Sequence, residues 1–380
     1  MKKILLVTER RADYSRFKEI LKEINNEDTL KYVLVVTGIH LEKSFGKTIN
    51  EIVNDGFKIS YKFKMFDKKY LKKDDIGGMS RALAQCFKHL TKIIEIEKPD
   101  FILSGFDIAA NFSLTTIGAH MNIPVGHIQG GEVSGNIDES LRHAMSKFSH
   151  LHFVSNSDAK KRLIKMGELK KSIYKVGCPS IDALLKTEDC SKSYMKIKYN
   201  LNINEKYILV IQHPVTSEKK LIKKHINNIF EALKNFKYKI FFILPNNDYG
   251  AKTIVNKIKV SKILYASHLN LADYKTLLKN CELILGNSSS GIHEAATFKK
   301  PAVNIGSRQQ GRFKGKNIID VGNNCNDIQK GVKKALSNNF NKKIKNIKNP
   351  YGSGGSSKKI VQIIKNLKFK KIKIQKQNTY

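Results

Sequence analysis

The sequence predicts an α/β fold with two doubly wound, Rossmann-like domains that face a cleft. Short apolar runs rich in β-branched residues recur along the chain, and amphipathic helical stretches separate them. Strands that alternate with helices in this way form parallel sheets with helices on both faces. The length of 380 residues exceeds what one ordinary hydrophobic core fills, so two domains are expected.

The apolar runs define the expected strands because each is short and bounded by polar or glycine-containing segments. In the first half, strands are expected at 3–8, 32–38, 100–105, 123–128, 151–155 and 173–177, with an amphipathic helix at 15–24. In the second half, strands are expected at 206–213, 239–245, 262–267, 282–287 and 301–306, with an amphipathic helix at 225–236.

A charged stretch without a strand candidate separates the two halves. We therefore predict an N-terminal domain over 1–184, a hinge or linker over 185–206 and a C-terminal domain over 207–355. The remaining residues, 356–380, are expected to form a C-terminal helix and a basic tail. Open parallel sheets bind ligands beyond the carboxyl ends of their strands, so residues that follow the strands are the candidate site residues.

The formal net charge of +36 is high enough to attract polyanions such as nucleic acids. The charge comes almost entirely from lysines spread along the chain, with no arginine-rich arm and no interleaved aromatic residues. A solvated lysine surface explains this pattern, so we expect no specific nucleic-acid partner. A basic nucleic-acid-binding protein is the alternative of another functional class.

The five cysteines include no CxxC pair, which favours a reducing compartment over a disulfide framework. The apolar run at the N-terminus is too short for a signal peptide, and no apolar segment reaches membrane-spanning length. A cytoplasmic protein without a membrane partner is therefore expected. His150 and His152 lack a third ligand at suitable spacing, so no metal site is predicted.

The segment 287–298, NSSSGIHEAATF, passes from a strand end into a predicted helix. Free amides and hydroxyls at a helix start bind phosphate, although an ordinary serine cap would need the same residues. Arginine is scarce in this chain, yet Arg11, Arg308 and Arg312 all follow predicted strands, where a planar, permanently charged group suits a phosphate. His213 also lies at a strand end, which favours a site role over a structural one.

The segment 127–143, HIQGGEVSGNIDESLRH, follows another predicted strand. Its two glycines allow a sharp turn, and a helix is expected from a cap at Asn136, with Leu141, Ala144, Met145 and Phe148 as its buried stripe. Asp138 and Arg142 are four residues apart and can pair on one helix face. Interaction with the helix dipole explains acids in the first turn, but Glu132 lies outside the helix and needs another explanation.

The residues so far described resemble the hydrolysing UDP-N-acetylglucosamine 2-epimerases of sialic acid and nonulosonic acid biosynthesis. The resemblance spans nearly the whole chain and rests on motifs at 11–15, 127–144, 177–182, 212–216, 286–295 and 301–312. It implies a glycosyltransferase class B-like fold with a nucleotide sugar in the cleft. It also implies anti elimination of UDP to a glycal, followed by hydration to N-acetylmannosamine. Neither NAD nor an obligatory metal is implied, and a homo-oligomer, dimeric or tetrameric, is expected.

The resemblance assigns roles to individual positions. The acids Asp107, Glu132 and Asp138 match positions around the sugar, and with His213 they are the catalytic candidates. Glu294 is expected to take the ribose hydroxyls, and the backbone near Leu269 lies beside the base. A carboxylate base suits removal of the nonacidic C2 proton, and cations suit a departing diphosphate. The positions matched to nucleotide binding are Arg11, Ser15, His213, Asn246, Leu269, Ser288, Ser289, Glu294 and Arg308.

Two positions depart from the family pattern. Non-hydrolysing relatives carry a glutamate where this chain has Gln129, and an amide cannot accept the proton, so Asp107 is favoured as the base. Phe106 stands where a glycine often precedes the aspartate, which predicts a different local loop. Two related activities remain alternatives: hydrolysing epimerisation of a UDP- or GDP-linked N,N'-diacetylbacillosamine for legionaminic acid, and class B glycosyl transfer to an acceptor.

Overall fold

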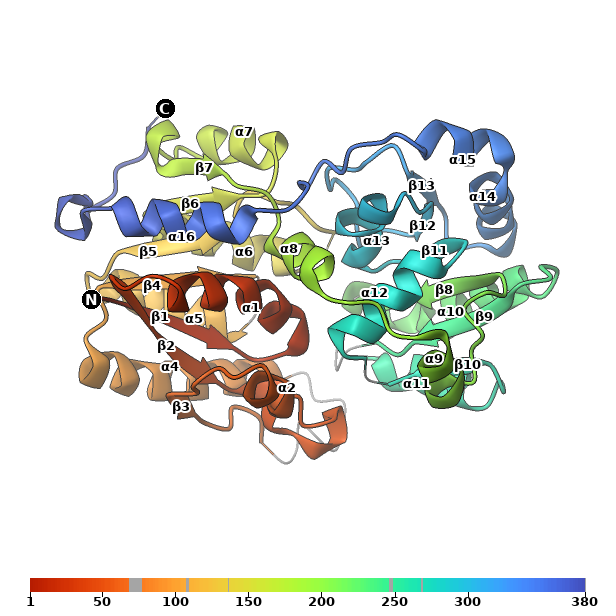
Figure 1. Ribbon diagram of the computed structural model, residues 1–380, viewed down its shortest axis with the longest axis horizontal. Coiled ribbons are helices and arrows are strands. Elements are labelled where there is room, and N and C mark those ends of the chain that lie inside the picture. The colour runs from red at the N-terminus through yellow and green to blue at the C-terminus, as the bar shows by residue number, and fades with distance from the viewer. Residues whose placement is uncertain (68–76, 107–108, 136, 246–248, 268, 380) are drawn as a thin grey trace. The chain divides into compact units, whose positions relative to one another are not determined.

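The computed structural model describes residues 1–67, 77–106, 109–135, 137–245, 249–267 and 269–379. The chain forms two compact units. The first comprises Met1–Glu132, Ile137–Ala183 and Gly354–Tyr380, and the second comprises Val133–Asn136 and Leu184–Ser353. Each unit contains one parallel sheet, so the predicted α/β class with two doubly wound sheets is confirmed (Figure 1).

The described part of the first unit contains a seven-stranded sheet in the order β3-β2-β1-β4-β5-β6-β7. Its strands are β1 (Lys2–Thr8), β2 (Leu30–Val36), β3 (Tyr61–Lys62), β4 (Phe101–Gly105), β5 (Val125–Ile128), β6 (Leu151–Val154) and β7 (Ile173–Lys175). Its helices are α1 (Arg11–Asn25), α2 (Ile49–Asn54), α4 (Gly78–Glu97), α5 (Ala109–His120), α6 (Ile137–Phe148), α7 (Ser157–Lys165), α8 (Pro179–Lys186), which runs on into the second unit, and α16 (Ser356–Asn366).

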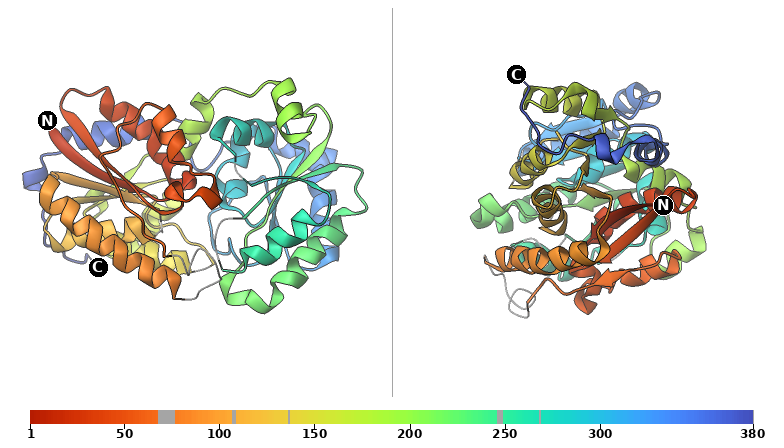
Figure 2. Two further views of the ribbon diagram at one scale, coloured as in Figure 1. Left: turned by 90° about the horizontal axis from the view of Figure 1, so that it is seen from below. Right: turned by 90° about the vertical axis from the view of Figure 1, so that its left-hand side faces the viewer.

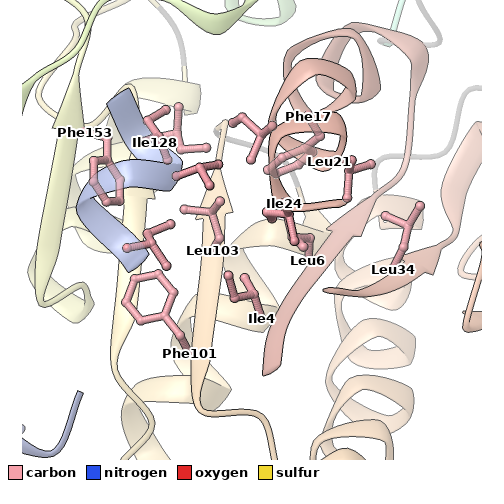
Figure 3. Packing of buried hydrophobic residues seen from close by; sticks show 14 of the residues in the cluster. Ile4, Leu6, Phe17, Leu21, Ile24, Leu34, Phe101, Leu103, Ile128 and Phe153 are labelled. Carbon is pink, nitrogen blue, oxygen red and sulfur yellow. The ribbon is translucent and has the colours of Figure 1, made fainter. Parts of the chain in front are cut away.

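Helices cover both faces of this sheet, which explains why its central strands are continuous apolar runs. Ile4 and Leu6 pack under α1 and α16, whereas Leu5 and Val7 pack toward α4 and α5. Figure 3 shows the first of these two layers, with Ile4 and Leu6 packed beside Leu103 of the neighbouring strand. Figure 2 shows the same sheet between α4 on one side and α1 with α16 on the other.

The described part of the second unit contains a six-stranded sheet in the order β10-β9-β8-β11-β12-β13. Its strands are β8 (Tyr207–Ile211), β9 (Lys239–Ile243), β10 (Leu264–Ala266), β11 (Leu283–Gly286), β12 (Ala302–Ile305) and β13 (Ile318–Val321). Its helices are α9 (Lys192–Tyr199), α10 (Ile222–Leu233), α11 (Ala251–Lys259), α12 (Leu271–Asn280), α13 (Ser289–His293), α14 (Cys325–Leu336) and α15 (Asn338–Ile344).

Every strand expected from an apolar run is present, but the sequence did not predict β3 or β13. Both are edge strands, and β13 buries only Ile319. An edge strand needs no continuous apolar run because it has a neighbour on one side only. The edge strands β7 and β10 do carry apolar runs, so a short apolar run predicts the central strands and only some of the edge strands.

Segments at the predicted domain borders pack into the cores of the units. In the predicted linker, Met195 of α9 is buried in the second unit, and Lys198 and Tyr199 both bond to Asp273 of α12 at 2.8 and 2.5 Å. At the other border, α16 packs on α1, and the Asp182 carboxylate accepts the first two backbone N–H groups of α16. The hinge role of 185–206 stays a prediction.

None of the helices in the described ranges is long and apolar enough to cross a membrane.

Candidate active site

Strand order reverses once in each sheet, and some of the candidate site residues follow the strands at these two points. β1 lies beside β4 in the first unit, and β8 lies beside β11 in the second. Each pair flanks a topological switch point, where the connections on either side leave the sheet in opposite directions and leave a crevice at the carboxyl ends. Ligand binding is therefore favoured beside His213 and Ser288 in the second unit.

Asn287 joins the two strand ends at the switch point of the second unit. Its side-chain Oδ1 accepts the backbone N–H of His213 at 2.7 Å, and its Nδ2 donates to the His213 carbonyl at 2.9 Å. This pair of bonds continues the β8–β11 ladder one residue beyond Gly286. Asn287 is 1% exposed, so its amide can satisfy these backbone groups without competition from water.

The backbone of Asn287 also fixes the loop after β12. Its carbonyl accepts Nη1 of Arg308 at 3.1 Å and Nε2 of Gln309 at 2.9 Å. The next residue, Ser288, is the N-cap of α13 and accepts the backbone N–H of Ser290. The structure thus brings three predicted residues, His213, Ser288 and Arg308, around one asparagine, and Ser289 opens the helix beside them.

A glycine makes this close approach of strands feasible. Gly286 has φ +130°, and a Cβ at this position would lie 2.1 Å from the carbonyl oxygen of Ile211. Any side chain would push β11 away from β8, so only glycine fits at this point. Gly291 is less constrained, because a Cβ there would meet the Cβ of Ala302 at an ordinary 3.4 Å.

Glu294 lies after α13 and is held by a tyrosine. Its Oε2 accepts the hydroxyl of Tyr274 at 2.6 Å, and both residues are buried. Burial and the Glu294 charge raise the pKa of Tyr274 well above its ordinary value, so the hydroxyl stays a donor. Tyr274 is in the first turns of α12, shortly after Leu269, whose side chain is buried.

Arg312 has a different environment from Arg308. Its Nε donates to the carbonyl of Val133 at 2.9 Å, and its Nη1 lies 3.1 Å from Nε2 of His293. In the same area Gly135 donates its backbone N–H to the carbonyl of Arg308 at 3.0 Å. The sequence grouped Arg312 with Arg308 as a phosphate ligand, whereas these contacts give Arg312 a role in fixing the 133–135 segment within the second unit.

Glu132 of the first unit is a buried carboxylic acid with two side-chain donors. It is 4% exposed, and its Oε1 accepts hydrogen bonds from Ser155 and from Nε2 of Gln129, the latter at 3.1 Å. Arg142 donates to the carbonyl of Glu132 at 2.9 Å. Gln129 therefore acts as a donor to Glu132, whereas a glutamate at 129 would place a second negative charge there.

Helix α6 carries Asp138 in its first turn, but its buried face differs from the predicted stripe. Among the four apolar residues expected to be buried, only Met145 is, whereas Arg142 and Ser146 are buried instead. Hydrogen bonds explain the exchange: Arg142 bonds to Glu132, and Ser146 lies 3.1 Å from Nδ1 of His127. Polar residues can occupy a buried helix face when each finds a partner.

Arg11 and Ser15 lie in the first turns of α1. This end of the helix is fixed by Asp13, whose carboxylate accepts the hydroxyl of Thr8 and the backbone N–H groups of Glu9 and Arg10 at 2.9–3.0 Å. The Ser15 hydroxyl donates to the carbonyl of Ala12. Both predicted ligands are therefore carried on a helix start that is anchored to the end of β1.

Phe106 adopts φ +64°, the left-handed region that favours glycine. Its ring packs edge-on against Phe17 at 5.2 Å, and the Arg16 guanidinium lies 5.0 Å from the ring centroid. Strain of this kind persists where packing overdetermines it, often beside functional residues. The residue that follows, Asp107, lies outside the described residues, as do Asn246 and the predicted cap Asn136.

Sequence reasoning missed three residues of this area: Asn287, Tyr274 and Ser155. Asn287 and Ser155 are each the last residue of a predicted strand, so their position was a usable signal. Tyr274 gave no such signal, because its partner Glu294 is 20 residues away in the sequence.

Comparison with known proteins identifies the family. A family model described as UDP-N-acetylglucosamine 2-epimerase matches residues 22–365. The chain belongs to the UDP-N-acetylglucosamine 2-epimerase family. It is 34% identical to a Legionella pneumophila protein named UDP-N,N'-diacetylbacillosamine 2-epimerase (hydrolyzing), over 100% of both chains. It is 32% identical to a Neisseria meningitidis serogroup B UDP-N-acetylglucosamine 2-epimerase, over 89% of this chain and 88% of the relative.

Solved epimerase structures share the fold. The UDP-GlcNAc 2-epimerase from Neisseria meningitidis bound to UDP-GlcNAc superposes with a TM-score of 0.83 at 22% identity, over 95% of this chain and 99% of that chain. The resemblance to the epimerase family and the fold class predicted from the sequence are thus both confirmed.

Proposed function

We propose that the protein is a hydrolysing 2-epimerase that converts UDP-N-acetylglucosamine and water to N-acetylmannosamine and UDP. Membership of the epimerase family supports the substrate class. The hydrogen bond from Gln129 to Glu132 carries the hydrolysing assignment. With an amide at 129, that position cannot take the C2 proton, and it serves instead to hold the neighbouring carboxylate.

The proposed reaction begins with an anti elimination. A carboxylate removes the C2 proton, the electron pair forms the C1–C2 double bond, and the C1–O bond breaks with its electrons leaving on UDP. Water then adds across the glycal, with hydroxyl at C1 and a proton returned to C2 on the opposite face. Asp107 is the proposed base, and Glu132 and Asp138 are proposed to handle the remaining proton transfers. Positioned acids and bases typically contribute ~10² to 10⁴-fold to such steps.

Departure of the diphosphate needs stabilisation of its growing charge. We assign this role to Arg308, to His213, to Ser288 and Ser289 at the start of α13, and to Arg11 and Ser15. Asn287 supports the assignment because its side chain holds the His213 backbone and its carbonyl holds the Arg308 guanidinium. Fixed donors stabilise a transition state more than mobile ones because they need no reorganisation. Glu294 and the backbone at Leu269 are proposed to hold the ribose and the base, and Asn246 to contact the nucleotide.

A second substrate has specific support. The relative named UDP-N,N'-diacetylbacillosamine 2-epimerase (hydrolyzing) matches this chain from end to end, with no uncovered segment on either side. The alternative is therefore the same elimination and hydration on a UDP-linked 2,4-diacetamido sugar. The two substrates differ at C4 and C6, away from the bonds that react.

The deciding experiment measures UDP release from both nucleotide sugars, followed by NMR of the sugar product in heavy water. We expect UDP release from UDP-N-acetylglucosamine and deuterium at C2 of free N-acetylmannosamine. Activity on the diacetamido sugar alone would transfer the assignment to the second candidate. Formation of UDP-N-acetylmannosamine without free sugar would refute hydrolysis.

A variant pair tests the diphosphate site. Arg308→Ala should lose turnover by at least tenfold, because it removes a charge-assisted donor from the leaving group. The matched control is Arg81→Ala, which removes a guanidinium from an exposed ion pair with Asp67. The control should keep full activity, and equal activity of the two variants would refute the role of Arg308.

A further inference from the structure

The switch point of the first unit holds a buried carboxylic acid that the proposed mechanism does not use. Glu9 follows β1 directly and is 6% exposed. Acidic side chains are almost never fully buried unless a partner satisfies them. Its position, two residues before Arg11 and at the point where β1 lies beside β4, places it among the candidate site residues.

Glu9 is bonded to the start of α5. Its Oε2 accepts the backbone N–H of Ala110 at 2.8 Å, across 101 residues of sequence. The first N–H groups of a helix have no partner within the helix, so a carboxylate from another element can cap them. An ionised carboxylate also interacts favourably with the positive end of the helix dipole. Glu9 thus anchors α5 to the end of β1, across the switch point.

Three contacts fix the position of Glu9 itself. Its backbone N–H donates to Asp13 at 2.9 Å, and its carbonyl accepts the backbone N–H of His40 at 3.3 Å. Gly38 has φ +65°, and a Cβ there would lie 2.5 Å from both Cβ and the carbonyl oxygen of Glu9. The main chain at Glu9 is therefore packed from α1 and from the segment after β2, and its side chain has little freedom.

The charged groups around Glu9 do not offset its burial. Burial raises the pKa of Glu9 to about 7; the Arg10 charge acts in the opposite direction, and the Asp13 carboxylate adds to the rise. On α4, the thiol of Cys86 also feels the Glu9 charge, and burial, reinforced by Glu9, raises the pKa of Cys86. Burial lowers the pKa of His40 to about 3, so that ring is neutral. Glu9 therefore changes charge in the neutral range, and its ionised form destabilises the fold.

We propose that Glu9 is a positioning residue for the reaction: its bond to Ala110 fixes the first turn of α5, most firmly when Glu9 is ionised. The proposal rests on the proposed function, in which Asp107, three positions before Ala110, is the base. A neutral amide would fit the same space at less cost to stability. Residues retained at such a cost are typical of functional sites.

Two substitutions separate the effect of the charge of Glu9 from the effect of its side-chain length. Glu9→Gln keeps the side-chain length and an acceptor oxygen but removes the charge. Glu9→Asp keeps the charge but is one methylene too short for the 2.8 Å bond to Ala110. The matched control is Glu19→Gln. Glu19 lies on α1, is only 2% exposed and pairs with Lys22, away from the strand ends.

The expected results concern turnover and stability together. At pH 8, kcat should fall about tenfold in both Glu9 variants and stay unchanged in Glu19→Gln. The rise of kcat through pH 7 should disappear in Glu9→Gln. The same variant should unfold a few degrees higher than the wild type at pH 8, with the difference vanishing near pH 5. Because the pKa of Glu9 is raised in the folded state, Glu9 contributes its full stability below its ordinary pKa of 4.5, and this contribution is lost as the pH rises through about 7.

Two outcomes would overturn the proposal. If Glu9→Gln keeps the kcat and the pH profile of the wild type, the charge of Glu9 has no positioning role in the reaction. Lower stability of Glu9→Gln at pH 8 would show an ordinary structural role. If the wild type releases UDP from neither sugar, the proposed function fails. Hydrogen exchange of the first turn of α5 then decides the anchoring separately, because faster exchange in Glu9→Asp supports it and unchanged exchange refutes it.

Discussion

Asn287→Asp tests whether one buried amide organises the nucleotide site. The substitution keeps the acceptor for the His213 N–H, which Oδ1 binds at 2.7 Å. It removes the Nδ2 donor to the His213 carbonyl and places a carboxylate oxygen opposite that carbonyl at about the same position. It also adds a negative charge beside Arg308, whose Nη1 binds the backbone carbonyl of the same residue.

The structure sets the expected magnitude. Asn287 and His213 are 1% and 7% exposed, so the His213 carbonyl, which keeps a long bond from Nε2 of Gln212 at 3.4 Å, gains little from water. A buried acceptor that loses its better donor costs about 1 to 3 kcal/mol, and the buried charge adds to this. We expect about 2 to 4 kcal/mol of lost stability. Misplacing one charge-assisted contact to the diphosphate, worth about 1.5 to 3 kcal/mol, weakens UDP binding by about ten- to a hundredfold.

Calorimetric titration with UDP measures the affinity, and thermal unfolding measures the stability. The control is Asn280→Asp, which removes the same kind of bond, from Nδ2 of Asn280 to the carbonyl of Thr276 at 2.8 Å, at the far end of α12. The control should lose stability but keep its UDP affinity. Wild-type UDP affinity in Asn287→Asp, or equal losses in the two variants, would refute the organising role of Asn287.

Three further substitutions probe single contacts. Tyr274→Phe removes the hydroxyl that donates to Glu294 at 2.6 Å. In titrations, UDP should bind several-fold more weakly to this variant, whereas the affinity for 2'-deoxy-UDP should change less. Equal losses of affinity for the two nucleotides would contradict this. Phe106→Gly relieves about 1 kcal/mol of backbone strain but removes a buried ring worth about 3 to 5 kcal/mol. The unfolding temperature should therefore fall, and a rise would contradict the packing argument. Burial alone would raise the pKa of Glu168, but its bonds to His152 and Lys376 lower the pKa to about 2. The stability that Glu168 contributes is therefore present above pH 4.5 and is lost as the pH falls toward 2. Glu168→Gln should lose less stability over this pH range in unfolding experiments, and an unchanged dependence of stability on pH would contradict the argument.

The candidate residues of the second unit show how far strand-end reasoning extends. His213, Ser288 and Arg308 were placed correctly after β8, β11 and β12, because apolar runs locate central strands and parallel strands end at one edge. The bonds that organise them were not predictable. Asn287 reaches a backbone 74 residues away, and no periodicity or spacing encodes such a pairing.

The sequence by itself determined the α/β class, the central strands and the strand ends where polar residues gather. These features are local, because each depends on short apolar runs and on the residues next to them. The tertiary structure alone decided which neighbour each polar side chain meets. It bonded Gln129 to Glu132, placed Arg142 on the buried face of α6 and anchored Ala110 to Glu9. Those choices follow from hydrogen bonding between distant segments in a dry interior, where most buried polar groups need a partner.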